Sequence, residues 1–253
     1  MKHGRCRLCL AEGLLVESHI IPKFQFKQLK KGDGHYHVLS PDPQKKDRKT
    51  QKEITENLFC RKCDTERLQF YEDHLARVLG AGKHGHPMRI EEHGRFARVQ
   101  DYDYLRVKNA LLSILWRMSL SRHDLFSNVS LGAHHEEELR RLLLNRERVA
   151  EERYGVSLAV PTIDGQHHPD LILSPDWDRL GHNRVYRCVI AGLLFTFDIG
   201  SAPPDAVLTP VLLREKEWWI MKAEMTEIPF LREQIRRLGT AQAIRDGRSL
   251  SMG

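Results

Sequence analysis

Two short motifs of identical spacing anchor the first part of the chain: Cys6-Arg7-Leu8-Cys9 and Cys60-Arg61-Lys62-Cys63. Each C-x-x-C step turns tightly enough to present two sulfurs to one ion, and two such steps are typical of a tetrahedral four-thiolate zinc site. The motifs hold four of the five cysteines, which argues against unrelated free thiols. The sequence therefore predicts one structural Zn²⁺ ion, bound by Cys6, Cys9, Cys60 and Cys63.

The sequence between and after these motifs predicts two strands and a helix. Leu14-Leu15-Val16 favours a short strand, which the step Ser18-His19-Ile20-Ile21-Pro22 brings to an end. The run from Ile54 to Phe59 favours a second strand. Apolar residues then recur on one helical face and predict a helix from about Thr65 to Leu79; they are Leu68, Tyr71, Leu75 and Val78.

This arrangement resembles the HNH family, the zinc-stapled (treble-clef) form of the ββα-metal nucleases, over about residues 4 to 80. The resemblance implies that the cysteine pairs are structural and that His19 is the general base. It also implies that Asp64, directly after the second motif, binds a catalytic Mg²⁺ or Mn²⁺ ion, for which a carboxylate is a suitable ligand. Asn57 takes the place of the family's middle asparagine, and Ser18 stands where the family has an acidic or imidazole ligand. The whole chain also resembles a group of uncharacterised bacterial HNH-like proteins with a Ser-His-Ile-Ile-Pro step and a later Leu-Trp-Arg helix.

The positive charge of the chain is concentrated near its N-terminus. The formal net charge is +6, and residues 1 to 64 hold 14 Lys and Arg against 8 Asp and Glu, which accounts for all of it. Binding to nucleic-acid phosphates requires a basic surface, although such a surface carries no sequence information. A polar tract in this region is expected to bind nucleic acid, with a solvated loop as the alternative; its basic residues are Lys45, Lys46, Arg48 and Lys49.

The composition is that of a globular protein long enough for two domains. The 253 residues are 41% hydrophobic and 29% charged. No apolar run is long enough to cross a membrane and no signal-peptide core is visible, so a cytoplasmic location without membrane contact is expected. Paired thiols in that compartment favour metal binding over disulfides. We expect a zinc-stapled HNH-like module at residues 1–80 and an α+β accessory domain at residues 81–253.

The sequence beyond residue 80 predicts two helices in succession. The first begins near Asp101 and is apolar over more than half its circumference. Trp116 is therefore expected in the core, with Arg117 at the surface, in preference to a role in stacking on a base. A charged helix from Glu136 to Tyr154 follows, and His134-His135 before it are expected to be exposed turn residues.

The last third of the chain changes to strand-like periodicity. Short β-prone runs with turn residues between them extend from Val156 to Leu213, and a helix follows Thr226. The predicted fold class is α+β, with the N-terminal zinc-stapled ββα module followed by helices and a small antiparallel sheet region.

The resemblance and the charge distribution together predict a metal-dependent endonuclease that hydrolyses DNA phosphodiester bonds with His19 as general base. The sequence does not distinguish cleavage of DNA from cleavage of RNA. The alternative is a non-catalytic zinc-binding module for nucleic acid or a protein partner, with which Ser18 is consistent. A second acidic or imidazole ligand within reach of the ion on Asp64 would distinguish the two.

Overall fold

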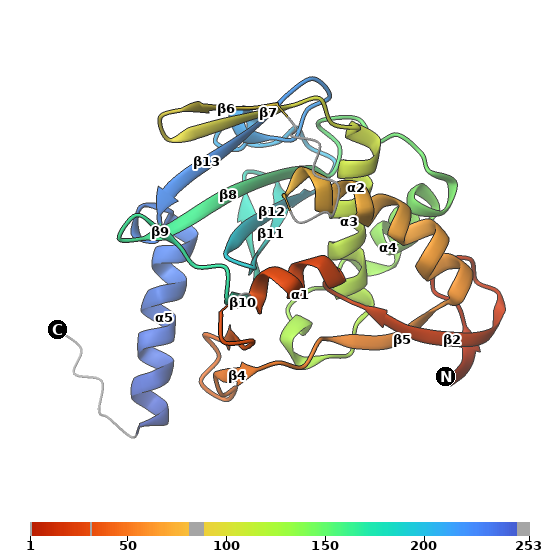
Figure 1. Cartoon of the computed structure of the whole chain (residues 1–253), viewed down its shortest axis with the longest axis horizontal. Coiled ribbons are helices and arrows are strands. Elements are labelled where there is room, and N and C mark those ends of the chain that lie inside the picture. The colour runs from red at the N-terminus through yellow and green to blue at the C-terminus, as the bar shows by residue number, and fades with distance from the viewer. Residues whose placement is uncertain (1, 31, 81–88, 247–253) are drawn as a thin grey trace.

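A computed structural model describes residues 2–30, 32–80 and 89–246 of the chain. Within them the protein is α+β, with five α-helices and two β-sheets (Figure 1). No helix in this part of the chain is long and apolar enough to span a bilayer.

A three-stranded antiparallel sheet carries the two cysteine motifs. Its strands, in order, are β1 (Lys2–Arg5), β2 (Glu12–His19) and β5 (Thr55–Cys60). The register between β2 and β5 shifts between Val16 and Glu17, and such a bulge changes the direction of the side chains that follow it. After the second motif, a π-helical segment, η1 (Cys63–Leu68), leads directly into α2 (Gln69–Val78). The two strands and the helix expected from the sequence are present.

The second sheet is large and mixed, with ten strands among the described residues. Its order is β4-β3-β10-β11-β12-β8-β13-β7-β6, and β9 pairs with β8. Two of its pairings, β3 with β10 and β13 with β8, are parallel. The strands are β3 (Tyr36–Leu39), β4 (Arg48–Thr50), β6 (Arg89–His93), β7 (Phe96–Gln100), β8 (Gly155–Ile163), β9 (Gln166–His167), β10 (Leu171–Leu180), β11 (Asn183–Ile190), β12 (Leu193–Ile199) and β13 (Trp218–Glu224).

The prediction of a small antiparallel sheet is therefore wrong in size and in pairing. Strands β3, β4, β6 and β7 come from the first hundred residues and extend both edges of the sheet. A short strand joins such a sheet through backbone hydrogen bonds to residues far away in sequence, and local periodicity carries no information about that partner.

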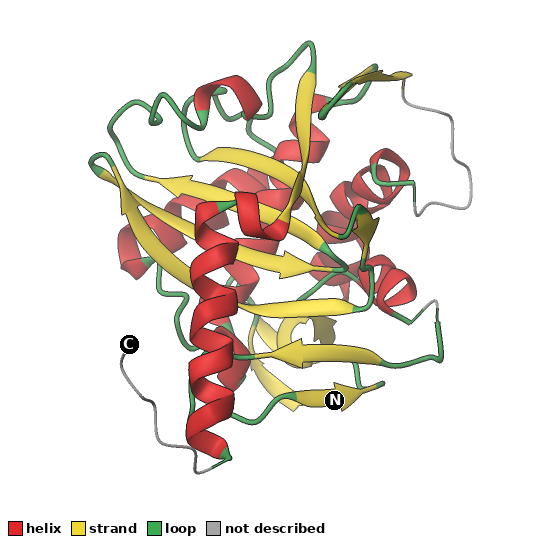
Figure 2. Cartoon of the chain, turned by 90° about the vertical axis from the view of Figure 1, so that its left-hand side faces the viewer, coloured by secondary structure: helices red, strands yellow, loops and turns green. Residues whose placement is uncertain are grey.

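Helices cover both faces of the large sheet, as Figures 1 and 2 show. α2, α3 (Tyr104–Leu120) and α4 (Gly132–Asn145) lie on one face, and α5 (Pro229–Arg245) lies on the other. Neighbouring side chains of β12 point to opposite faces of the large sheet. Phe195 belongs to the buried cluster that includes α3, whereas Leu194 belongs to the cluster that includes α5. The remaining helix, α1 (Lys23–Leu29), follows β2.

One buried cluster extends across the boundary predicted near residue 80. In it, Trp116 of α3 is 1% exposed and stacks on Phe59 of β5 with 5.6 Å between the ring centroids. This core position for Trp116 agrees with the prediction, while the division of the chain at residue 80 stays a prediction. Helix α4 ends at Asn145, earlier than expected, because Arg146 adopts a left-handed conformation with φ 56°.

Candidate metal centre and histidine site

The four cysteines of the two motifs come together at one end of the small sheet. Their sulfur atoms all lie within 4.8 Å of one another, and Cys9 Sγ lies 3.9 Å from Cys60 Sγ. Four thiolates around a tetrahedral zinc ion, at a bond length near 2.3 Å, have their sulfurs about 3.8 Å apart. The group therefore has the composition and the spacing to hold a metal ion such as Zn²⁺.

The electrostatics of the thiols are consistent with a cation at their centre. A hydrogen bond from the Cys63 thiol lowers the pKa of Cys6 to about 4, and the same contact, together with burial, raises the pKa of Cys63. Cys6 is thus readily ionised, while Cys63 holds its proton. A bound divalent cation would favour the ionised form of each thiol ligand, because it attracts the thiolate.

His19 ends the strand that leaves the cysteine cluster, and its ring is held by a carboxylate. Its Nε2 lies 2.7 Å from Glu53 Oε2, and Lys30 Nζ lies 2.9 Å from Glu53 Oε1. Burial acts to raise the pKa of Glu53, but the hydrogen bonds from His19 and Lys30 outweigh it and lower that pKa. Glu53 is therefore an anion at neutral pH, and an anion accepts a hydrogen bond from Nε2–H. In that tautomer the lone pair of the neutral imidazole is on Nδ1.

A buried arginine connects His19 to the helix after the second motif. The Nη1 nitrogen of Arg117 lies 2.7 Å from the carbonyl oxygen of His19 and 2.7 Å from Oε1 of Glu72 in α2. The side chain of Arg117 is only 2% exposed, so its expected surface position is wrong. An arginine tolerates such burial when a carboxylate and carbonyl oxygens satisfy its donors.

The carboxylate of Glu72 shares its electrostatic environment with the predicted metal ligand. Burial raises the pKa of Glu72, Arg117 and His19 oppose this rise, and the nearby charge of Asp64 adds to it. The side chain of Glu72 is 17% exposed. His19, Asp64, Glu72 and Arg117 thus gather where β2, η1, α2 and α3 meet.

Breaking the buried ion pair tests how this junction is held. Arg117→Met removes the guanidinium and leaves the Glu72 carboxylate without its partner, so we expect a loss of about 3–5 kcal/mol in the free energy of unfolding. Arg141→Met is the matched control, because Arg141 is 57% exposed and its ion pair with Glu147 is long, at 3.8 Å. We expect this variant to lose less than about 1 kcal/mol in the free energy of unfolding. Urea unfolding measures both, and similar small losses would mean that Glu72 is solvated without Arg117.

Asp64 is not part of a preformed cluster of three ligands. Among the described residues, three or more His, Cys, Asp or Glu ligand atoms lie within 4.8 Å of one another in two groups, the four cysteines and His134, His135 and Glu138. Neither group includes Asp64, so no two further ligand atoms of these kinds join it within that distance among the described residues. The assignment of Asp64 to a catalytic ion stays a prediction.

The positions of Ser18 and Asn57 follow from the strand register. Ser18 is fully buried, and its hydroxyl donates to the Val16 carbonyl oxygen at 3.4 Å, so it is no ligand in this conformation. Glu17 is exposed and pairs across the strands with Asn57. The Nδ2 of Asn57 is buried without a hydrogen-bond partner among the described residues. A catalytic role for Asn57 stays a prediction.

The second group of possible ligands lies on α4 and is already engaged. His134 and His135 were expected in an exposed turn, but both lie in the first turns of this helix. His135 Nδ1 lies 2.9 Å from the Tyr154 hydroxyl, and Glu138 accepts hydrogen bonds from Tyr154 and Arg153. A metal ion here would have to displace the Arg153 guanidinium.

The predicted basic tract is partly neutralised by its own surroundings. Lys45 Nζ donates to the carbonyl oxygen of Asp124 at 2.9 Å, and Lys49 pairs with Asp33 at 2.6 Å. The tract lines a pocket of about 380 Å³ whose wall also contains three carboxylates. The charged residues of this pocket are Lys45, Lys46, Arg48 and Lys52 against Glu17, Glu53 and Asp124.

A second basic groove, which the sequence did not predict, lies against the small sheet. It has a volume of about 570 Å³ and includes four cationic side chains but one carboxylate, that of Glu56. Glu56 is already bound by the backbone N–H of Arg122 at 3.0 Å and by the Ser121 hydroxyl. Both pockets include Thr55, the residue that pairs with His19 across the strands. The cations of this basic groove are Lys2, Arg5, Arg7 and Arg122.

The roles of Glu53, Glu72 and Arg117 escaped prediction, because neither glutamate belongs to a recognisable motif and Arg117 was expected at the surface. Two weak signals in the sequence pointed to a site role for the glutamates. Glu53 stands directly before a predicted strand, and Glu72 follows Asp64 by two helical turns. Comparison of the chain with protein-family models, with curated proteins and with solved structures finds no match.

Proposed function

We propose that this chain is a zinc-stapled, metal-dependent endonuclease of the HNH type that hydrolyses phosphodiester bonds in DNA. The observation that carries the proposal is the 2.7 Å contact between His19 Nε2 and Glu53, at the end of a strand that leaves the four-cysteine cluster. An imidazole oriented by a carboxylate is the arrangement that general-base catalysis uses.

In the proposed reaction, Nδ1 of His19 takes a proton from a water molecule, which attacks the phosphorus in line with the departing 3′ oxygen. Glu53 fixes the ring and stabilises the imidazolium that forms. Asp64 would hold a Mg²⁺ or Mn²⁺ ion, which supplies positive charge for the leaving oxygen. Glu72 contributes less to that ion because Arg117 already neutralises it at 2.7 Å.

The substrate strand is proposed to follow the basic groove rather than the predicted tract. The groove presents four cations against one carboxylate, whereas the pocket at the tract presents four cations against three carboxylates. Phosphate is attracted more strongly to a lining with a large excess of positive charge than to one whose cations are offset by carboxylates.

The salt dependence of DNA binding separates these two surfaces. Replacing Lys2, Arg7 and Arg122 by glutamine should reduce the slope of log K against log salt by about 2–3 units, since each phosphate contact contributes about 0.9. Replacing Lys46, Arg48 and Lys49 removes the same charge and should reduce the slope by about 1 unit. Fluorescence anisotropy with a labelled duplex, in protein of equal zinc content, measures both. The reverse order of effects would assign the phosphate path to the tract.

The second candidate is a zinc-binding module that binds nucleic acid or a protein partner without cutting. The buried position of Ser18 and the lack of a preformed three-ligand cluster at Asp64 among the described residues favour it. Incubation of plasmid DNA and of RNA with the protein and Mg²⁺ or Mn²⁺ decides between the two. Binding without any cleavage under these conditions would leave the non-catalytic module in place.

A further inference from the structure

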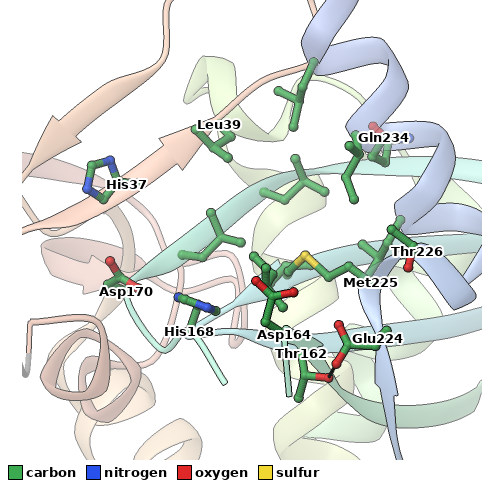
Figure 3. Close-up of a pocket in the computed structure, with 17 residues that line it drawn as sticks. His37, Leu39, Thr162, Asp164, His168, Asp170, Glu224, Met225, Thr226 and Gln234 are labelled. Atoms are coloured by element: carbon green, nitrogen blue, oxygen red, sulfur yellow. Dashed lines mark hydrogen bonds between the residues drawn. The ribbon is translucent and has the colours of Figure 1, made fainter. Parts of the chain in front are cut away.

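A groove on the far side of the large sheet lies apart from both the cysteines and His19. It has a volume of about 570 Å³ and runs between α5 and the sheet, where β3, β10 and β11 approach the helix (Figure 3). The turn between β8 and β9 and the 3₁₀ segment η4 (Met225–Glu227) close one side. Its size is within the range of pockets that enclose small organic molecules.

The floor of this groove is apolar. Aliphatic and thioether side chains from the sheet face and from α5 make up most of the wall, and they belong to or pack against the smaller buried cluster. They include Leu39, Leu171, Leu173, Val189, Met225 and Leu231. Such a surface favours a ligand with a hydrocarbon body, because burial of that body releases water from both partners.

The charges at the edge of the groove are all negative. Its described lining contains the carboxylates of Asp164, Asp170 and Glu224 and the imidazoles of His37 and His168, but no Lys or Arg. Figure 3 shows these five side chains around the hydrophobic floor. In a chain with a net charge of +6, an anionic edge of this kind excludes phosphates and nucleotides and attracts cations.

One of these carboxylates is fixed in place before any ligand arrives. Glu224 Oε1 accepts hydrogen bonds from the Thr162 hydroxyl and from the Gly165 N–H, each at 2.7 Å. Asp164 and Gly165 form the turn between β8 and β9, with φ of 50° and 74°, which Asp-Gly pairs adopt readily. The bond from Thr162 lowers the pKa of Glu224, which keeps it ionised near neutral pH.

A buried acceptor in the wall also lacks a donor. Gln234 of α5 is 2% exposed, and its Nε2 donates to Asp176 Oδ2 at 3.2 Å, which identifies the other amide atom as the oxygen. That oxygen has no hydrogen-bond partner among the described residues. This oxygen and the carboxylates give the groove hydrogen-bond acceptors and negative charge. The complementary ligand is therefore a hydrogen-bond donor that carries positive charge.

We propose that this groove is a binding site for a small organic cation, an amphipathic molecule with a hydrocarbon body and an ammonium or amidinium group. The body lies on the floor formed by the sheet and α5. The cationic group lies at Asp164 and Glu224, beside the turn between β8 and β9. The site is separate from the proposed nuclease centre, so its occupation can be measured without any cleavage assay.

Three probes with the same hydrocarbon chain test the proposal: octylammonium, octanoate and octanol, each titrated calorimetrically into the full-length protein below its aggregation concentration. We expect octylammonium to bind about tenfold more tightly than octanoate, with octanol between them. Ile235 is 43% exposed and lines the groove. Ile235→Lys places a cation there and should weaken the binding of octylammonium while the fold remains intact.

A pair of double variants with equal loss of charge identifies the carboxylates. Asp164→Asn with Glu224→Gln keeps the acceptors but removes two negative charges at the groove, and should abolish the preference for octylammonium. Glu227→Gln with Glu233→Gln removes two negative charges from exposed residues outside the lining, and should preserve it. Equal affinity for all three probes, no binding of any probe, or an unchanged preference in the first double variant would each overturn the proposal.

Discussion

Replacement of Cys60 by serine is expected to lower the zinc content of the purified protein from about one ion per chain to near zero and to loosen the small sheet. A structural zinc site that loses one of its four thiolates binds the ion much more weakly, and the free energy of zinc binding is also free energy of folding. The loss should reduce the melting temperature by at least about 10 °C. Metal analysis and a thermal melt measure the two effects.

Cys188→Ser is the matched control for this experiment. It makes the same chemical change at a cysteine of β11 that is 2% exposed and lies outside the four-cysteine group. Its zinc content should stay near one ion per chain, with a modest cost from the buried hydroxyl. Hydrogen exchange in Cys60→Ser should increase first in β1, β2 and β5. A Cys60→Ser protein with full zinc content and unchanged melting would refute the four-thiolate site.

Removal of the proposed base should have the second largest effect. His19→Ala eliminates proton abstraction, so we expect DNA cleavage with Mg²⁺ or Mn²⁺ to fall by about two to four orders of magnitude. The affinity for DNA should remain nearly unchanged, because the basic groove lies on other residues. Plasmid cleavage and anisotropy, performed on the same preparations, measure the two quantities separately. His93→Ala is the control, since His93 is an exposed histidine on β6.

Glu53→Gln distinguishes a positioning role from a structural one. Glutamine keeps an acceptor for Nε2 of His19 but removes the negative charge that stabilises the imidazolium, so cleavage should fall by about tenfold to hundredfold. The melting temperature and the zinc content should stay at the wild-type values, because the amide oxygen keeps the hydrogen bond to the ring. A merely structural role would instead lower the melting temperature and leave the activity of the folded protein unchanged. If His19→Ala cuts DNA as well as the wild type does, His19 is not the base.

The sequence alone was sufficient for the elements whose information is local. The spacing of the cysteine motifs predicted the group that the structure brings together, because a C-x-x-C turn needs only its own residues to present two sulfurs. The strand before His19 and the helix after Cys63 followed from periodicity, which is also local. The burial of Trp116 followed from the apolar circumference of its helix.

The residues around His19 were decided by tertiary structure. Glu53 contacts the His19 ring from 34 residues further along the chain, and Arg117, 98 residues away, donates to the backbone carbonyl oxygen of His19. An ordinary surface arginine and this buried one look alike in sequence, because the difference lies in the carboxylate and the carbonyl oxygen that meet it after folding. The basic groove has the same origin, since Lys2, Arg7 and Arg122 become neighbours only when the small sheet packs against the end of α3.

The large sheet shows the same division. Periodicity predicted strands β8, β10, β11 and β12, but the predicted run from Val207 to Leu213 instead contains the 3₁₀ segment η3 (Thr209–Val211). The partners at the two ends of this group, β3 for β10 and β13 for β8, depend on backbone hydrogen bonds that periodicity does not reveal. These pairings join residues far apart in the chain, and a backbone N–H or C=O carries no side-chain identity that would reveal its partner in advance. The sequence by itself therefore determined the four-cysteine group and the local elements. Only the folded chain determined which charges surround His19, which cations form a groove and which face of the sheet α5 covers.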